Sequence, residues 1–129
     1  MKRILLTLLL TIILISATAA AQAETELDAC RRLAAKYGAE LEVVTKDGAR
    51  CDMLTATEAI EVDWARKWAE GIGQSLYYAT VLDRQPAVIL LVTGERDQRY
   101  VARCRVVCER YGIRLYTEAA VKNKPTQKP

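Results

Sequence analysis

The sequence of 129 residues contains no histidine and no phenylalanine, and it has only three prolines and six glycines. Without histidine, a His-bound zinc site and a Ser-His-Asp triad are excluded, so any chemistry falls to carboxylates, Lys, Tyr and Cys. The sequence also lacks a large excess of one charge, because it has 19 Lys and Arg and 16 Asp and Glu, which gives a net charge of +3. The balance predicts no general attraction to nucleic acid or to a membrane surface, and a basic site would have to be local.

The first 23 residues have the pattern of an export signal. Lys2 and Arg3 precede an apolar run over residues 4–15, and small residues then lead to Ala23. The run is shorter than the roughly 20 residues of a membrane span. We therefore expect cleavage before Glu24, a periplasmic or secreted protein, and no stable membrane insertion after cleavage. Losing the signal would lower the net charge from +3 to +1.

The remaining chain is long enough for one domain, which we expect over residues 24–118, with a flexible tail at 119–129. The apolar periodicity predicts the following elements: a helix over 25–37, strands over 41–45, 50–55 and 58–63, a helix over 64–79, a strand over 87–92, a helix over 96–111 and a strand over 113–117. This order predicts an α/β fold, a mixed β-sheet flanked by helices, with a right-handed parallel crossover from the strand at 87–92 through the helix at 96–111 to the strand at 113–117.

Four cysteines, Cys30, Cys51, Cys104 and Cys108, allow three disulfide pairings in an exported chain. The sequence does not choose among the pairings. A redox function is a distant alternative because no C-x-x-C is present, and Cys104 and Cys108 fall on the apolar stripe of their helix.

The two strands over 50–63 contain the clearest chemical pattern. A turn around residues 56 and 57 would place Asp52 opposite Glu61 and Arg50 opposite Asp63. One face of this hairpin would hold Arg50, Asp52, Leu54, Ala59, Glu61 and Asp63, and the core face would hold Cys51, Met53, Ile60 and Val62.

Opposed carboxylates destabilise a sheet unless a cation compensates them. That cation is Arg50, Lys67 or a hard divalent metal, which favours carboxylate and carbonyl oxygens. The alternative is a solvated face of salt bridges without a site. Because Ala-Thr lacks the Gly or Asn of a favoured two-residue turn, a slip of one residue would also separate Asp52 from Glu61.

The following helix presents two stripes. The apolar stripe is formed by Trp64, Trp68, Ile72, Leu76 and Ala79, and the polar ridge by Lys67, Glu70, Gln74 and Tyr78. Such a ridge is ordinarily the solvated side of a helix. Gly71 and Gly73 are unfavourable inside a helix, which indicates that another backbone passes close by.

Taken together, Asp52, Glu61-Val62-Asp63, Lys67, and Gln74 with Tyr78 four residues later resemble the core of the PD-(D/E)XK nuclease superfamily. The similarity is to its RecB-type branch with a Q-x-x-x-Y helix motif, and in particular to small exported members of unknown function. The resemblance covers about 30 residues and implies a restriction-endonuclease-like fold. It implies that Asp52, Glu61 and the carbonyl of Val62 bind Mg²⁺ or Mn²⁺.

One position departs from that family's pattern, because Asp63 stands where the family has its catalytic lysine. The resemblance implies that Lys67 supplies the missing charge from the helix, that Asp63 becomes a further ligand, and that Gln74 and Tyr78 lie near the scissile phosphate.

We therefore expect an exported, metal-dependent hydrolase of DNA or RNA, with a homodimer as one way to hold a duplex. The alternative is a degenerate nuclease fold that serves as a binding or envelope-interaction module.

Overall fold

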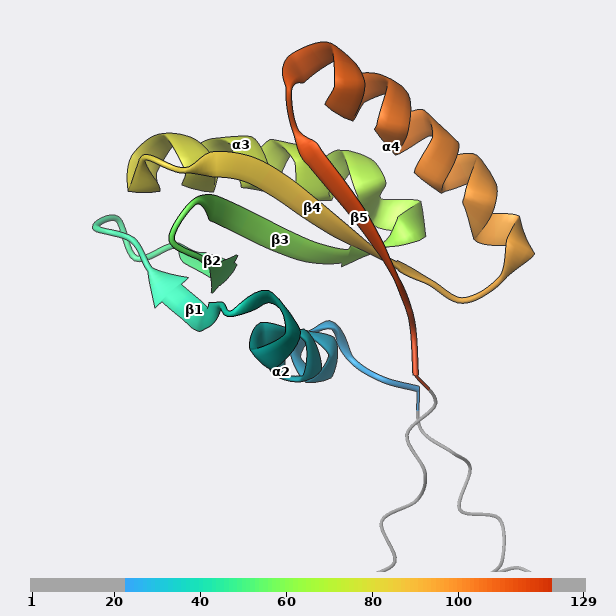
Figure 1. Ribbon diagram of the computed structural model, residues 1–129, viewed down its shortest axis with the longest axis horizontal. Helices are drawn as coiled ribbons and strands as arrows, with labels where there is room; N and C mark the ends of the chain where they lie inside the picture. The colour runs from blue at the N-terminus through green and yellow to red at the C-terminus, as the bar shows by residue number, and fades with distance from the viewer. Residues whose placement is uncertain (1–22, 122–129) are drawn as a thin grey trace, which may run out of the picture. The chain divides into compact units, whose positions relative to one another are not determined.

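The computed structural model describes residues 23–121, of which Glu24–Val121 form one α/β unit. Its elements, labelled as in Figure 1, are α2 (Glu26–Tyr37), β1 (Glu40–Val44), β2 (Arg50–Leu54), β3 (Glu58–Trp64), η1 (Ala65–Lys67), α3 (Trp68–Leu82), β4 (Gln85–Val92), η2 (Glu95–Asp97), α4 (Gln98–Tyr111) and β5 (Arg114–Ala119). The predicted α/β class and the predicted order of helices and strands are confirmed.

The bounds of this unit can be compared with the predicted export signal and the predicted tail. Residues 1–22 of the predicted export signal and residues 122–129 of the predicted tail lie outside the described residues. Residues 119–121, which fall in the predicted tail, belong to the unit instead. β5 continues to Ala119, and the backbone N–H of Val121 donates to the Glu24 carboxylate at 2.9 Å.

The five strands form a single mixed sheet in the order β1-β2-β3-β4-β5. β1, β2 and β3 are antiparallel neighbours, whereas β3, β4 and β5 run parallel and are joined through α3 and α4. The predicted parallel pairing of the last two strands is therefore confirmed, and the parallel pairing of β3 with β4 is an additional finding. β3 lies at the change from antiparallel to parallel pairing.

Helices cover both faces of this sheet, with α2 on one side and α3 and α4 on the other (Figure 1). β4 contributes to both cores, because Ala87, Ile89 and Leu91 pack on the α2 side while Val88 and Leu90 pack against α3 and α4. This double burial agrees with the continuous apolar run in the sequence and is typical of a parallel strand.

Local signals define the ends of α2. The Thr25 hydroxyl accepts from the N–H of Asp28, and the Asp28 carboxylate accepts from the N–H of Thr25 in return, which forms a capping box. Gly38 ends the helix with φ 60°, a left-handed conformation in which a β-carbon is unfavourable.

The predicted start of the second helix at residue 64 is wrong. β3 continues through Trp64, a short 3₁₀ turn follows, and α3 begins at Trp68. Trp64 packs in the α2-side core and Trp68 in the core on the opposite face, so the two do not share one stripe. The prediction failed because an apolar residue at the end of a buried strand matches a helical period by coincidence.

The four cysteines form no disulfide bond within residues 23–121, and each is a buried thiol. Two of them, Cys30 and Cys51, belong to different core clusters, and Cys104 and Cys108 share a third. Cys30 and Cys51 are therefore separated from each other and from the other two cysteines. The Sγ atoms of Cys104 and Cys108 are 3.6 Å apart, a contact between thiols on successive turns of α4. The expected disulfide framework is therefore corrected. No helix among the described residues has the length and apolar character to span a bilayer.

Candidate functional site: a carboxylate pair between β2 and β3

The β2–β3 hairpin has the predicted register, with Met53 opposite Ile60 and Leu54 opposite Ala59. The Ala56-Thr57 turn is feasible because the hydroxyl of Thr55 accepts from the backbone N–H of Glu58 at 2.8 Å and from that of Thr57 at 3.2 Å. A side-chain acceptor thus replaces the Gly or Asn that such a turn ordinarily needs.

Beyond Met53 and Ile60 the strands are joined through carboxylates. The N–H of Asp52 donates to Glu61 Oε1 at 3.2 Å, and the N–H of Val62 donates to Asp52 Oδ2 at 2.9 Å. Each carboxylate therefore reaches the backbone of the opposite strand. The predicted proximity of Asp52 and Glu61 across neighbouring strands is confirmed.

This part of the sheet is irregular. Cys51 and Leu54 pack in the same cluster although they are three residues apart, whereas Met53 packs on the α2 side. Side chains alternate strictly in a regular strand, so β2 changes face near Asp52. The predicted placement of Cys51 on the face of Met53 is therefore wrong. In the adjacent strand β1, Glu42 has φ 50°, which costs free energy for a residue with a β-carbon.

Burial changes the acidity of both members of the pair. Glu61 is 4% exposed, and the loss of hydration, followed by the charge of Asp52, raises its pKa to about 8. Asp52 is half-buried, and desolvation also raises its pKa, partly opposed by the hydrogen bond from Val62. Among the described residues, no Lys or Arg forms an ion pair with either carboxylate. The pair therefore repels internally when both groups are ionised.

Arg50 was one predicted source of compensating charge, but it is placed elsewhere. Its guanidinium forms an ion pair with Glu42 on β1 at 3.2 Å, and the regular β2–β3 pairing, Met53 with Ile60 and Leu54 with Ala59, does not extend to Asp63. The prediction that Arg50 faces Asp63 is not supported by the structure, because the irregularity at Asp52 interrupts the ladder.

Lys67, the other predicted source of compensating charge, is surrounded by acidic neighbours. Its Nζ lies 2.9 Å from Asp63, 3.1 Å from Glu26 at the start of α2, and 3.8 Å from Glu70. Hydrogen bonding to Asp63 is the main reason that the pKa of Lys67 is raised. Asp63 is 3% exposed, and its pKa is raised to about 6 by desolvation, with Lys67 acting in the opposite direction. Lys67 therefore compensates Asp63 directly, and its charge also lowers the pKa of Asp52.

The rest of the polar ridge divides between two environments. Tyr78 is buried beside Cys51 and Ala59, and desolvation followed by the charge of Glu61 raises its pKa. Gln74, by contrast, is exposed. The actual buried stripe of α3 is Gly71, Ile72, Ser75, Tyr78 and Ala79, whereas Leu76 is 40% exposed. Leu76 is thus wrongly predicted as core, because the stripe is rotated relative to the pattern of large apolar residues.

Gly71 lies where α3 packs against the side chains of β3 and β4. A β-carbon at this position would lie 3.5 Å from Asp63 Oδ2 and 3.4 Å from Val88 Cγ1, whereas one at Gly73 would meet open space. The predicted close approach of another backbone is therefore wrong at both glycines, because Gly71 meets only side-chain atoms at ordinary contact distances.

The donor atoms near the pair are suited to a hard divalent cation. Asp52 and Glu61 supply carboxylate oxygens, and the Val62 carbonyl faces β2 because the N–H and C=O of one strand residue point to the same side. Within residues 23–121, no group of three or more His, Cys, Asp or Glu side chains is arranged to hold a metal ion. The fit therefore rests on two carboxylates and one main-chain oxygen, with Asp63 directed to Lys67.

Three neighbours of this site were not identified from the sequence. The charges of Glu26 and Glu42 add to desolvation in raising the pKa of Asp52. Burial, followed by the charges of Asp52 and Glu61, raises the pKa of the Cys30 thiol. These residues come from α2 and β1, and no spacing in the chain relates them to the hairpin. Only the packing of α2 across the sheet brings them to the site.

Comparison with known proteins gives one informative similarity. The chain is similar to the putative KilA-N domain-containing protein L33 of Acanthamoeba polyphaga mimivirus, with 32% identity over 106 residues. The match covers 79% of this chain and 40% of the viral protein, so the chain spans about two fifths of that relative's length. No family model matches the chain. No solved structure matches it.

Proposed function

We propose that the protein is a nuclease of the PD-(D/E)XK type that hydrolyses phosphodiester bonds of DNA or RNA with Mg²⁺ or Mn²⁺. The proposal rests on one observation, the pair of carboxylates that share the gap between β2 and β3 without an ion-paired Lys or Arg. A divalent cation would compensate that pair, held by Asp52, Glu61 and the Val62 carbonyl. When bound, it would polarise the phosphate and lower the pKa of its water.

The remaining roles fall to side chains of this chain. Lys67 is one-third exposed and fixed by Asp63 and Glu26, so its ammonium would orient the scissile phosphate or the attacking water. Tyr78 is buried with Cys51 and Ala59 on the α3 side of the hairpin and would help to keep water from this part of the site. Gln74 is exposed on α3 and would contact the substrate rather than the ion.

The alternative is a binding module that has lost turnover, and a specific observation favours it. Lys67 is bound by three carboxylates, and Asp63 occupies the lysine position of the nuclease motif. Under this alternative, no divalent ion supports hydrolysis, and replacing Glu61 by Gln leaves partner binding unchanged.

Hydrolysis of supercoiled DNA, linear DNA and RNA with Mg²⁺ or Mn²⁺ tests the proposal, with EDTA and Glu61→Gln as negative controls. Glu109→Gln removes the same charge from an exposed position on α4 and serves as the matched variant. We expect cleavage by the wild type and by Glu109→Gln, and none by Glu61→Gln or in EDTA. Absence of cleavage on every substrate would favour the binding module. Cleavage that persists in EDTA and in Glu61→Gln would place the activity elsewhere.

We also propose that the protein is exported and that its mature form begins at Glu24. The four free thiols are compatible with an oxidising compartment because none is more than 3% exposed. Mass spectrometry of the protein recovered from cells tests this, with a mass for residues 24–129 expected. Recovery of the uncleaved chain alone would contradict export.

A further inference from the structure

α4 covers the same face of the sheet as α3, and its exposed side carries a row of arginines. Arg99, Arg103 and Arg110 are all exposed. At 100° per residue they fall within about 40° of one another around the helix, opposite the buried stripe of Val101, Cys104 and Cys108. We call these three residues the arginine row. With a rise of 1.5 Å per residue, it extends over about 16 Å.

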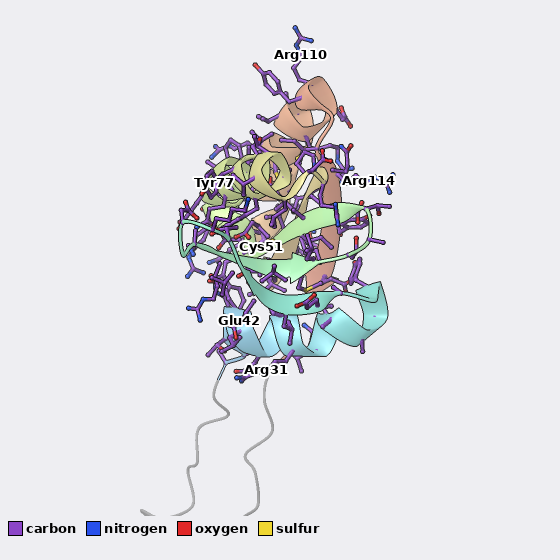
Figure 2. All side chains as sticks on the ribbon, turned by 90° about the vertical axis from the view of Figure 1, so that its left-hand side faces the viewer. Arg31, Glu42, Cys51, Tyr77, Arg110 and Arg114 are labelled. Atoms are coloured by element: carbon purple, nitrogen blue, oxygen red, sulfur yellow. The ribbon has the colours of Figure 1, made fainter. Side chains whose placement is uncertain are left out.

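The arginine row forms no ion pairs with carboxylates of the described residues. Within residues 23–121, none of its members pairs with a carboxylate, whereas α2 has each of its basic residues, Arg31, Arg32 and Lys36, in an ion pair. Figure 2 shows Arg110 projecting from the end of α4, away from the sheet, with Arg31 on the opposite side of the unit. The charges of the row therefore face solvent.

Two tyrosine rings lie beside these arginines. The guanidinium carbon of Arg99 lies 4.7 Å from the ring centroid of Tyr100, and that of Arg103 lies 5.9 Å from it. Arg110 lies 5.9 Å from the ring centroid of Tyr111, which is 69% exposed. Such contacts restrict the guanidinium groups. Arg99 Nη2 also donates to the Tyr100 hydroxyl at 2.9 Å, and its other N–H groups remain for an external ligand.

We propose that the arginine row binds the phosphodiester backbone of a nucleic acid. All four basic residues of α4 are arginines, whose planar groups match the geometry of phosphate oxygens, and exposed tyrosine offers a surface on which a base can stack. An anionic membrane fits less well, because the apolar side of α4 is buried in the core and is not free to enter lipid. This inference does not depend on hydrolysis, since a binding module would use the same surface.

The arginine row would give a chain with little net charge a local surface that attracts a polyanion. All 16 acidic residues fall within the described unit, while Lys2, Arg3, Lys122, Lys124 and Lys128 fall outside it. The unit by itself is therefore slightly acidic, and attraction to a polyanion must come from a particular surface. The carboxylate-rich surroundings of Lys67 cannot provide it, whereas α4 carries only Glu109 against four arginines.

Fluorescence anisotropy with labelled single-stranded DNA, duplex DNA and RNA in EDTA tests the row without any cleavage. The test variant is Arg99→Gln/Arg103→Gln/Arg110→Gln. The control, Arg31→Gln/Lys46→Gln/Arg105→Gln, removes the same charge from exposed positions outside the row. Glutamine is about as good a helix former as arginine, so α4 is retained. We expect at least a tenfold loss of affinity at 50 mM salt in the test variant and less than about a threefold loss in the control.

The salt dependence provides a second measurement. Three phosphate contacts predict a slope of log K against log salt near −2 for single strands and near −2.7 for a duplex, and the test variant should flatten it by about 2 to 3. Equal losses in the two variants would refute the row, as would binding of the wild type to vesicles with 30% anionic lipid but to no nucleic acid. If the test variant does not fold, a wild-type slope shallower than −1 refutes it instead. Cleavage without any loss of affinity in the test variant would refute only the row, and row-dependent binding without cleavage would refute only the nuclease.

Discussion

Replacing Glu61 by Gln should stabilise the folded protein at alkaline pH. The pKa of Glu61 is about 8 in the folded state against 4.5 ordinarily, so the folded protein holds a proton that the unfolded chain releases between those values. The free energy of unfolding therefore falls as pH rises from 4.5 to 8. Above pH 8 Glu61 is ionised in the folded state, and its full destabilising effect on the fold is reached. Glutamine has no ionisable group and so removes this pH-dependent loss of stability, and its side-chain oxygen can still accept the hydrogen bond from the Asp52 N–H.

The magnitude follows from the same pKa values. A difference of that size corresponds to at most about 5 kcal/mol, at about 1.4 kcal/mol per unit. The new amide NH₂ group is buried and costs about 1–3 kcal/mol if it finds no acceptor. We therefore expect Glu61→Gln to raise the free energy of unfolding by about 2–3 kcal/mol at pH 8 and to have no benefit at pH 5, where Glu61 is already protonated.

Glu24→Gln is the matched control, because Glu24 and Glu61 are both 4% exposed. The Arg32 guanidinium binds Glu24 at 2.8 and 3.0 Å and is the main reason that the pKa of this carboxyl is lowered. Its charged form is stabilising above its ordinary pKa, and that contribution is lost only in acid. Glu24→Gln should therefore destabilise the protein by about 1–3 kcal/mol at both pH 5 and pH 8.

Urea unfolding in EDTA, followed by tryptophan fluorescence at several pH values between 5 and 9, measures these differences. An unchanged urea dependence of the free energy would show that both variants unfold from the same compact state. If Glu61→Gln is no more stable than the wild type at pH 8, Glu61 is not held as a buried, repelled carboxylate, and the basis for a cation at this site is removed.

Three further predictions concern the same region. Mn²⁺ at 100 times its dissociation constant should stabilise the wild type by about 2.7 kcal/mol but leave Glu61→Gln unchanged, measured by urea unfolding; equal stabilisation of both would place the metal elsewhere. Lys67→Ala should lower the rate of DNA cleavage more than Asp63→Ala, measured under identical Mg²⁺; the reverse order would mean that Lys67 is not the missing cation. Gly73→Ala should stabilise α3 by about 0.5–1 kcal/mol in thermal unfolding, with a smaller gain for Gly71→Ala because its β-carbon meets Asp63.

Local sequence patterns were sufficient for the order of elements and for the hairpin register. Apolar periodicity depends only on which side of an element is buried, and capping residues such as Thr25 and Gly38 act within one turn. The register at Met53 and Ile60 followed from a turn of fixed length, so Asp52 and Glu61 were brought together by short-range geometry.

Tertiary packing decided the environment of those carboxylates. The irregularity at Asp52 directs Cys51 toward α3 and separates Arg50 from Asp63, and the approach of α2 adds Glu26 to the surroundings of Lys67. Burial of Tyr78 depends on how α3 packs on the sheet, where Tyr78 joins Cys51 and Ala59 in one cluster. Spacing along one chain cannot encode these features, because they arise from contacts between elements distant in sequence. The amino-acid order thus determined which acidic residues meet, and the packing of helices on both sheet faces determined that they meet out of water and without a positive partner.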